Sequence, residues 1–321
     1  MTDKTNVEQK EPKEERSQKS ADTEEGVLSE LVPEQRKTPF YQAVNAERYQ
    51  RQALIKEINR ATGHPLICYV SGVNAQLDRD DIIGFIDLLH NISPGSDLDL
   101  MLHTGGGDFN AADKLISLVR RTVGNGILRI IIPDYAKSAG TLMCLGADRL
   151  LMSDPSELGP IDPQIVLGDG DGNRIRYSVL SYIDAYQEHS DRLKADPSNI
   201  PSQLMINKFD PMRLKQFEAF KERVRKIAED TLKRGMFRNG NGNFTLAART
   251  LLDTKRWPDH GQMITWEDAT DPSIGLVVDH LDSDSEEWQR YWQLYCLQRW
   301  TIKDHQKIFE SDYASMVVDG R

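Results

Sequence analysis

One serine and a run of three glycines are the residues of this 321-residue chain whose types and setting best suit nucleophilic chemistry. Ser138 stands in the stretch AKSAGT, where an apolar run gives way to a helical pattern. A serine at a strand-to-helix turn exposes its hydroxyl, and the N–H groups that follow it favour a developing anion. The same position also suits a serine that only caps a helix. Ser138 is therefore a candidate nucleophile, with a helix cap as the alternative.

The glycine run lies in HTGGGDFNAA, residues 103–112. Consecutive glycines let the backbone approach a ligand with N–H groups pointing outward, which is the geometry that an oxyanion needs. The run is not the dinucleotide pattern GxGxxG, and it is not a P-loop, because no Gly-Lys-Ser/Thr follows. His103, just before the glycines, either lines the cleft or ends the strand.

Alternating short strands and helices must position these two stretches. Apolar runs predict strands over residues 66–72, 98–104 and 127–133, with helices over 78–92 and 110–123 between them. Strands that are almost wholly apolar are covered on both faces, as in a parallel sheet with crossover helices. Such sheets build their sites where strands end, and both stretches follow strand ends. We predict an α/β core over residues 64–165.

The flanking segments differ in composition. Residues 1–33 are polar and charged and predict a disordered acidic tail, and residues 34–63 predict an N-terminal helix. Beyond the core, amphipathic helices are predicted over 178–194 and 211–235. For residues 281–321 we predict an aromatic-rich, helical extension. The apolar surface of the long helix and of the extension predicts a homo-oligomer.

Charge and cysteine usage exclude several classes of protein. The net charge of −10 and the absence of a clustered basic face argue against a nucleic-acid partner. Cys68, Cys144 and Cys296 lack the paired spacing of zinc or disulfide sites, and we expect buried free thiols. No apolar run approaches the ~20 residues of a membrane span, and the N-terminus is no export signal. We expect a cytoplasmic protein.

The combination of HTGGG with AKSAGTLMCLGADRLLMSDPSELGPIDPQ resembles the serine dehydrogenase proteinase (SDH) family of Clp-fold serine proteinases. This family lies within the superfamily of signal peptide peptidase A, Clp peptidases and crotonases. A third similar stretch covers residues 252–279, so that the resemblance spans about residues 64–280. It implies a Clp/crotonase fold of ββα units with a helical arm that drives oligomer formation. It also implies Ser138 as nucleophile and an oxyanion hole of Gly106 or Gly107 with Ala139.

The general base is not fixed by the resemblance. Clp peptidases place a histidine where this chain has Ile161 and Asp162. The signal peptide peptidase A branch uses a lysine, and the best positional match is Lys208, which Met205, Ile206 and Phe209 flank. A lysine has an ordinary pKa of about 10.4 and needs desolvation to act as a base.

Several other residues remain candidates for the base. Lys194 is the second lysine, and His260 is the alternative histidine, with His189 and Asp162 as further substitutes. Asp210 could pair with Lys208 and keep it charged, which would oppose the role.

The expected function is a serine peptidase that hydrolyses peptides or unfolded proteins through an acyl-enzyme with a Ser138–Lys208 dyad. Neither a metal nor a nucleotide cofactor is needed. One alternative is a catalytically silent Clp-fold scaffold or peptide-binding protein. Another is a crotonase-like acyl-CoA enzyme, which would need no serine at the turn.

Overall fold

The computed structural model describes residues 37–168 and 174–320, in two compact units, residues 1–47 and 48–321. The predicted tail over residues 1–33 lies outside the described residues. In the first unit, helix α2 (Pro39–Val44) begins after Thr38, whose hydroxyl accepts the N–H of Tyr41. Proline at the first helical position fits, because its missing N–H would have no partner there. Helix α3 (Ala46–Thr62) starts in the first unit and continues into the second.

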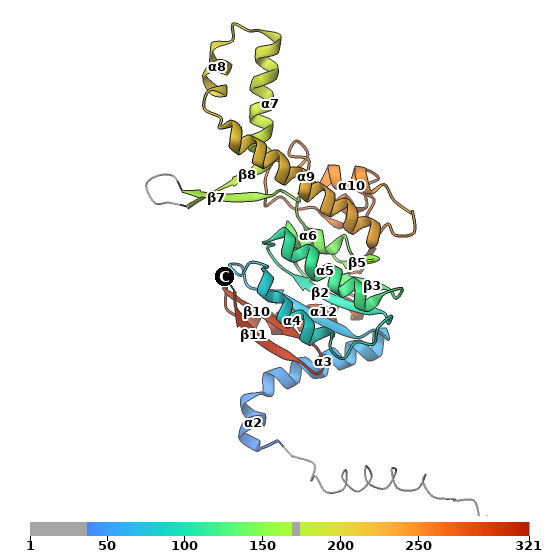
Figure 1. Ribbon diagram of the computed structural model, residues 1–321. Helices are drawn as coiled ribbons and strands as arrows, with labels where there is room; N and C mark the ends of the chain where they lie inside the picture. The colour runs from blue at the N-terminus through green and yellow to red at the C-terminus, as the bar shows by residue number, and fades with distance from the viewer. Residues whose placement is uncertain (1–36, 169–173, 321) are drawn as a thin grey trace, which may run out of the picture. The chain divides into compact units, whose positions relative to one another are not determined.

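A seven-stranded sheet of order β11-β10-β1-β2-β3-β5-β9 organises the second unit (Figure 1). The five strands β1, β2, β3, β5 and β9 are parallel, and β10 runs antiparallel to β1. Both β1 and β2 are buried at every residue, as sheets covered on both faces require. The strands are β1 (Leu66–Ser71), β2 (Leu98–His103), β3 (Leu128–Ile131), β5 (Arg149–Met152), β9 (Val278–His280), β10 (Gln306–Glu310) and β11 (Ser315–Asp319).

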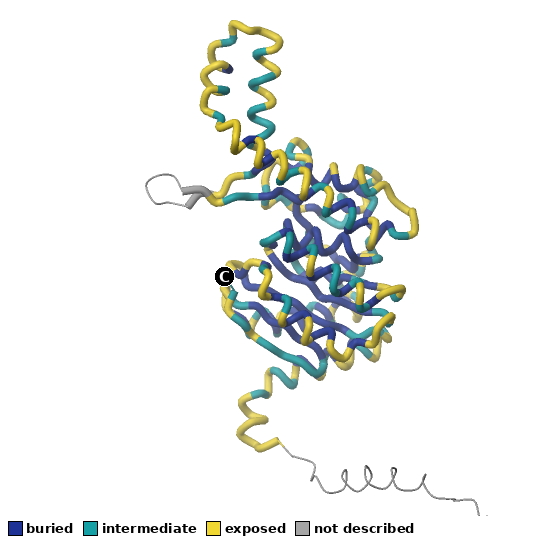
Figure 2. Tube along the Cα trace, in the orientation of Figure 1, coloured by how far each residue is buried: buried dark blue, intermediate teal, exposed yellow. Residues whose placement is uncertain are grey.

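Helices cover the two faces of the sheet and make two apolar clusters. The larger cluster includes residues of α4 (Ile82–Leu89), α5 (Phe109–Val123), α6 (Ala139–Cys144), α9 (Pro211–Arg234) and α10 (Phe244–Leu251). The smaller cluster joins Ile55 and Ile58 of α3 to Trp288 and Tyr291 of α12 (Glu286–Thr301). Figure 2 shows these buried residues running along the central strands and the helices beside them. The sheet is thus the middle layer of a three-layer α/β fold.

Shorter elements complete the fold around the strand ends. Strands β4 (Tyr135–Ala136) and β6 (Glu157–Leu158) pair in parallel, and β7 (Gln164–Gly168) and β8 (Arg174–Ser178) form an antiparallel pair. Helices α7 (Val179–Ala195) and α8 (Ile200–Ile206) lie side by side (Figure 1), and most of their residues are partly or fully exposed. The remaining elements are the short helix η1 (Arg79–Asp81) and α11 (Trp266–Thr270).

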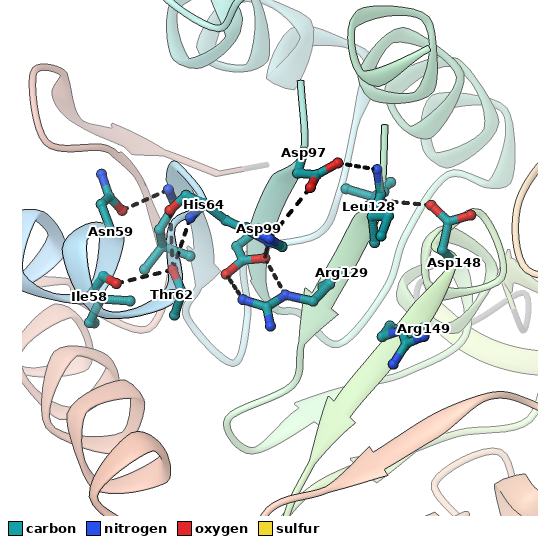
Figure 3. A network of polar contacts seen from close by, with 12 residues as sticks. Ile58, Asn59, Thr62, His64, Asp97, Asp99, Leu128, Arg129, Asp148 and Arg149 are labelled. Atoms are coloured by element: carbon teal, nitrogen blue, oxygen red, sulfur yellow. Dashed lines mark hydrogen bonds and ion pairs between the residues drawn. The ribbon is translucent and has the colours of Figure 1, made fainter. Parts of the chain in front are cut away.

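A buried polar network joins the amino ends of the central strands. Asp99 of β2 is fully buried, and Arg129 of β3 donates to both of its carboxylate oxygens (Figure 3). His64, just before β1, lies 3.1 Å from the same carboxylate. A buried carboxylate is stable only with such partners, so the network fixes the relative positions of β1, β2 and β3. This rigid end lies opposite the strand ends that carry Ser138 and the glycine loop.

The α/β prediction is confirmed, since the predicted strands and helices of residues 64–165 are all present. In the C-terminal extension, α12 is the expected helix, and it is followed by β10 and β11, which the helical prediction did not include. Over the described residues, none of the helices combines the length and apolar character that crossing a membrane requires.

Candidate active site

Ser138 occupies a strained turn between β4 and α6. Its φ of 53° and ψ of −113° make it the one non-glycine residue with positive φ among those that the structure describes. Holding such a conformation costs about 1–3 kcal/mol, which the surrounding packing must offset. The side chain makes no hydrogen bond to the first turn of α6, although Ser138 is at the capping position. The hydroxyl is therefore not used as a helix cap.

Backbone pairing brings the glycine loop to this serine. Thr104 accepts a hydrogen bond from the N–H of Lys137 at 2.9 Å, and its own N–H donates to Tyr135. These two bonds continue the sheet past β2 and join the residue before the glycines to the residue before Ser138. The loop and the serine are thus held against each other by main-chain contacts.

Two of the glycines have no room for a side chain. Gly106 has a φ of 97°, and a Cβ there would lie 2.9 Å from Cβ of Ser138. At Gly107, with a φ of 152°, a Cβ would lie 2.2 Å from the carbonyl oxygen of Leu77. Gly105 differs, because nothing lies within 4 Å of the position that a Cβ would take. Glycine is therefore required at positions 106 and 107 for packing and conformation.

The predicted oxyanion donors differ in availability. The N–H of Gly106 donates to the hydroxyl of Thr104 at 3.1 Å, and its carbonyl accepts from Leu77 at 2.8 Å. Within residues 37–168 and 174–320, the N–H groups of Gly107 and Ala139 have no hydrogen bond. These two groups, from the loop and from the start of α6, are the donors that remain free for an anion.

A cleft of about 490 Å³ collects these groups. Ser138, Gly106, Gly107 and His260 are among the residues that line it. Its walls also include residues of β7, β8 and α9, namely Gln164, Val166, Arg176 and Phe220. Sequence reasoning missed these wall residues, although for the two strands QIVL is a short apolar run and RIRYS alternates polar and apolar residues. The cleft thus joins one candidate nucleophile, one candidate base and the glycine loop.

His260 is supported by a carboxylate. Its Nδ1 lies 3.3 Å from Oδ2 of Asp162, whose other oxygen accepts the hydroxyl of Ser178 at 2.7 Å. Lys137, beside Ser138 in sequence, donates through Nζ to the carbonyl of Gly261 at 3.2 Å. This contact ties the turn that carries His260 to the turn that carries Ser138. A direct hydrogen bond between Ser138 and His260 is not formed, and apo sites often tighten only with substrate.

The lysine candidates are placed elsewhere on the second unit. Lys208 is exposed in the turn between α8 and α9, and Asp210 beside it caps α9 by accepting the N–H of Met212. Lys194 is exposed on α7, where its Nζ lies 2.9 Å from Asp191. His189 lies 3.2 Å from the hydroxyl of Ser202. None of these candidates is among the residues that line the cleft.

His103 ends β2 behind the glycine loop and is fully buried. Its Nδ1 lies 3.0 Å from the carbonyl oxygen of Ser71, and its Nε2 lies 3.3 Å from Asp134. Burial lowers the pKa of His103. Partial burial acts to raise the pKa of Asp134, but His103 and the hydroxyl of Tyr295 hold it below its ordinary value. Of the two alternatives for His103, the structure therefore has the one in which it ends the strand.

Comparison with known proteins places the glycine loop and Ser138 in one matched region. Residues 78–189 match the family described as ClpP-like SDH-type serine proteinase. An uncharacterized protein of Methanocaldococcus jannaschii is 40% identical over 68 residues, 21% of this chain and 23% of the relative. A second uncharacterized protein of that organism is 26% identical over 184 residues, 53% of this chain and 56% of the relative. The chain therefore spans less than two thirds of the length of either relative.

Among solved structures, a mutant of the 1510-N membrane-bound stomatin-specific protease in complex with a substrate peptide is similar, with a TM-score of 0.40 and 14% identity. The similarity covers 67% of this chain and 75% of that one. ClpP1 from Listeria monocytogenes has a TM-score of 0.38 and 10% identity, over 72% of this chain and 96% of that one.

The family match contains the glycine loop, Ser138 and Asp162, whereas Lys194, Lys208 and His260 lie outside it. The α/β architecture and the motif resemblance agree with this match. The segment that holds the strained serine and its glycine loop therefore matches the family described as ClpP-like SDH-type serine proteinase, the family that its motifs resemble.

Proposed function

We propose that this protein is a serine peptidase that cleaves peptide bonds through an acyl-enzyme on Ser138. One observation carries the proposal: a strained, uncapped serine lines the same cleft as a glycine loop, and two nearby N–H groups have no partner among the described residues. A serine hydroxyl needs both a base and a site for the developing oxyanion. The N–H groups of Gly107 and Ala139 supply that site.

The base that the geometry supports best is His260, oriented by Asp162. In the first step, Ser138 Oγ attacks the substrate carbonyl carbon while its proton passes to Nε2 of His260. The carbonyl oxygen becomes an oxyanion that accepts from Gly107 and Ala139. His260 then gives the proton to the leaving amine, and water hydrolyses the acyl-enzyme by the same route. Asp162 accepts Nδ1–H of His260 and so keeps Nε2 free as the acceptor.

The Ser138–Lys208 dyad stays a competing proposal for the base. Desolvation is what would make a lysine neutral near working pH, and Lys208 is exposed. A histidine in general does not depend on desolvation to act as a base near neutral pH. The shared cleft therefore favours the histidine within a single chain.

The substrate that fits this site is a peptide or an unfolded segment of a protein in extended form. Beside the cleft, β7 contributes the apolar wall residue Val166, and β8 contributes the charged wall residue Arg176. A homo-oligomer also remains part of the proposal, because two apolar side chains of α8 are largely exposed and would be covered by a second copy. Ile200 is 64% exposed and Leu204 is 60% exposed.

The test is hydrolysis of a fluorogenic unfolded protein by the wild type and by single variants. We expect Ser138→Ala and His260→Gln each to lower kcat/KM by about a thousandfold or more, since they act as one unit. Asp162→Asn should lower it by about a hundredfold or more through the wrong histidine tautomer. Lys208→Ala and Lys194→Ala serve as matched controls and should stay near the wild-type rate.

The outcomes separate the alternatives. Loss in Lys208→Ala with activity kept in His260→Gln would restore the Ser–Lys dyad. Hydrolysis of an acyl-CoA thioester in place of peptides would favour the crotonase-like enzyme. A wild type that binds unfolded protein but hydrolyses neither substrate would favour the scaffold.

A further inference from the structure

A second cavity, of about 320 Å³, lies between α5, the end of α9 and the turn after α6. It shares no lining residue with the cleft of Ser138. Four arginines line it: Arg120 and Arg121 from the last turn of α5, Arg234 at the end of α9, and Arg238 just beyond. Such a concentration of positive charge is unusual in a chain whose net charge is −10. The charge distribution alone marks this cavity as a place for an anion.

The arginines are only partly neutralised by protein carboxylates. Asp148 pairs with both Arg120 and Arg238, at 2.8 and 2.7 Å. Arg234 pairs with Asp113 at 2.8 Å. Arg121 makes no ion pair or hydrogen bond with any residue that the structure describes. The four guanidinium groups therefore face two carboxylates, and positive charge is left over.

Two of these arginines also cover the groups that would repel an anion. Arg238 donates to the carbonyl oxygens of Gly124 and Gly126, at 3.3 and 3.2 Å. Arg120 reaches the Gly124 carbonyl at 3.5 Å. Gly124 caps the C-terminus of α5 and Gly126 lies in the turn just after it, at the end where the helix dipole is negative. Since Arg120 and Arg238 cover these carbonyl oxygens, Arg121 and Arg234 are the arginines that keep free N–H donors for an anion.

A buried hydroxyl gives independent evidence for a missing partner. Thr231 of α9 lines the cavity and is only 2% exposed. Its Oγ1 is buried and has no hydrogen-bond partner among the described residues. A buried polar group without a partner costs about 1–3 kcal/mol, so native proteins seldom leave one unpaired. An anion held by the arginines would supply the acceptor that this hydroxyl lacks.

We propose that this cavity binds the phosphate group of a small phosphorylated molecule. The planar, forked donors of arginine match the oxygens of a phosphate, and they form stronger hydrogen bonds with a charged acceptor than with a neutral one. The volume of about 320 Å³ is at the lower end of ligand pockets and leaves room for a small organic group beside the phosphate. The site is separate from the proposed peptidase chemistry and does not depend on it.

Calorimetric titration of the full chain with ribose 5-phosphate, at constant ionic strength, tests the proposal. Ribose is the control ligand without a phosphate. Arg121→Gln removes a guanidinium that holds no carboxylate, and Thr231→Val removes the hydroxyl while keeping the shape. The control variant is Arg223→Gln, an exposed arginine on α9 that does not line the cavity. Melting temperatures without ligand check that each variant is folded.

We expect saturable binding of ribose 5-phosphate and none of ribose. Each cavity variant should raise the dissociation constant of ribose 5-phosphate by about tenfold, since each removes a hydrogen bond to a charged group. Arg223→Gln should bind as the wild type does. Thr231→Val should melt no lower than the wild type, because it removes an unpaired polar atom. The proposal is overturned if the wild type binds no ribose 5-phosphate, if ribose binds equally, or if either cavity variant keeps wild-type affinity.

Discussion

At the scale of single residues, the glycine loop and Ser138 could be predicted, but their division of roles could not. The motif alone could not show whether Gly106 or Gly107 is the oxyanion donor, because the sequence does not distinguish their N–H groups. The hydrogen bond from Gly106 to Thr104 separates them and leaves Gly107 and Ala139 as free donors. His260 and Asp162 are far apart along the chain, so their 3.3 Å contact depends on tertiary structure. The family resemblance and the apolar flank favoured Lys208, which lies in an exposed turn.

The close approach of Gly106 to Ser138 gives a sharp test at this scale. In Gly106→Ala the new Cβ would meet the Ser138 Cβ at 2.9 Å and would also strain a φ of 97°. We expect the rate of peptide hydrolysis to fall by about a hundredfold or more, because small misplacements of reacting groups are costly. Gly105→Ala is the matched control in the same loop, where the added methyl meets nothing. Equal rates in the two variants would contradict the assigned geometry.

At the scale of elements, the central strands were predictable, because long apolar runs are typical of buried parallel strands. The pairs β7–β8 and β10–β11 were not, since each strand has only five residues and is partly exposed or close to a strong helical pattern. Strand β10 joins the sheet by pairing with β1, and Arg51 of α3 donates to the fully buried Glu310 of β10 at 2.8 Å. That contact joins residues from opposite ends of the chain, so no local sequence pattern predicts it.

His103 at the end of β2 and Asp134 just after β3 also make the stability of the fold depend on pH. Burial holds the pKa of His103 below its ordinary value of 6.5, so the folded protein binds this proton later than the unfolded chain does. The contribution of His103 to the free energy of unfolding therefore decreases as the pH falls below about 6.5. The lowered pKa of Asp134 acts at more acidic pH, below its ordinary 3.8.

We expect His103→Gln to reduce the loss of unfolding free energy between about pH 7 and about pH 5, measured by urea denaturation. His305→Gln is the control, because that side chain is 57% exposed. An unchanged pH dependence in His103→Gln would argue against a buried, neutral His103.

At the scale of the whole molecule, the account predicts self-association through the helices that follow β8. Three apolar side chains on α8 and at the start of α9 are largely exposed: Ile200 by 64%, Leu204 by 60% and Met212 by 72%. Leaving this apolar surface in water is unfavourable for a monomer. Leu204→Glu should lower the mass measured by light scattering at micromolar concentration. Ile127→Glu, at a residue 40% exposed and outside these helices, should not. A wild type that is already a stable monomer would refute this prediction.

The central claim, that Ser138 is an activated nucleophile, is tested most directly by labelling with a fluorophosphonate probe followed by mass spectrometry of the peptides. The account predicts one covalent adduct on Ser138 of the wild type and none in a folded Ser138→Ala variant. Labelling that is absent from the wild type, or that persists in Ser138→Ala, would contradict it.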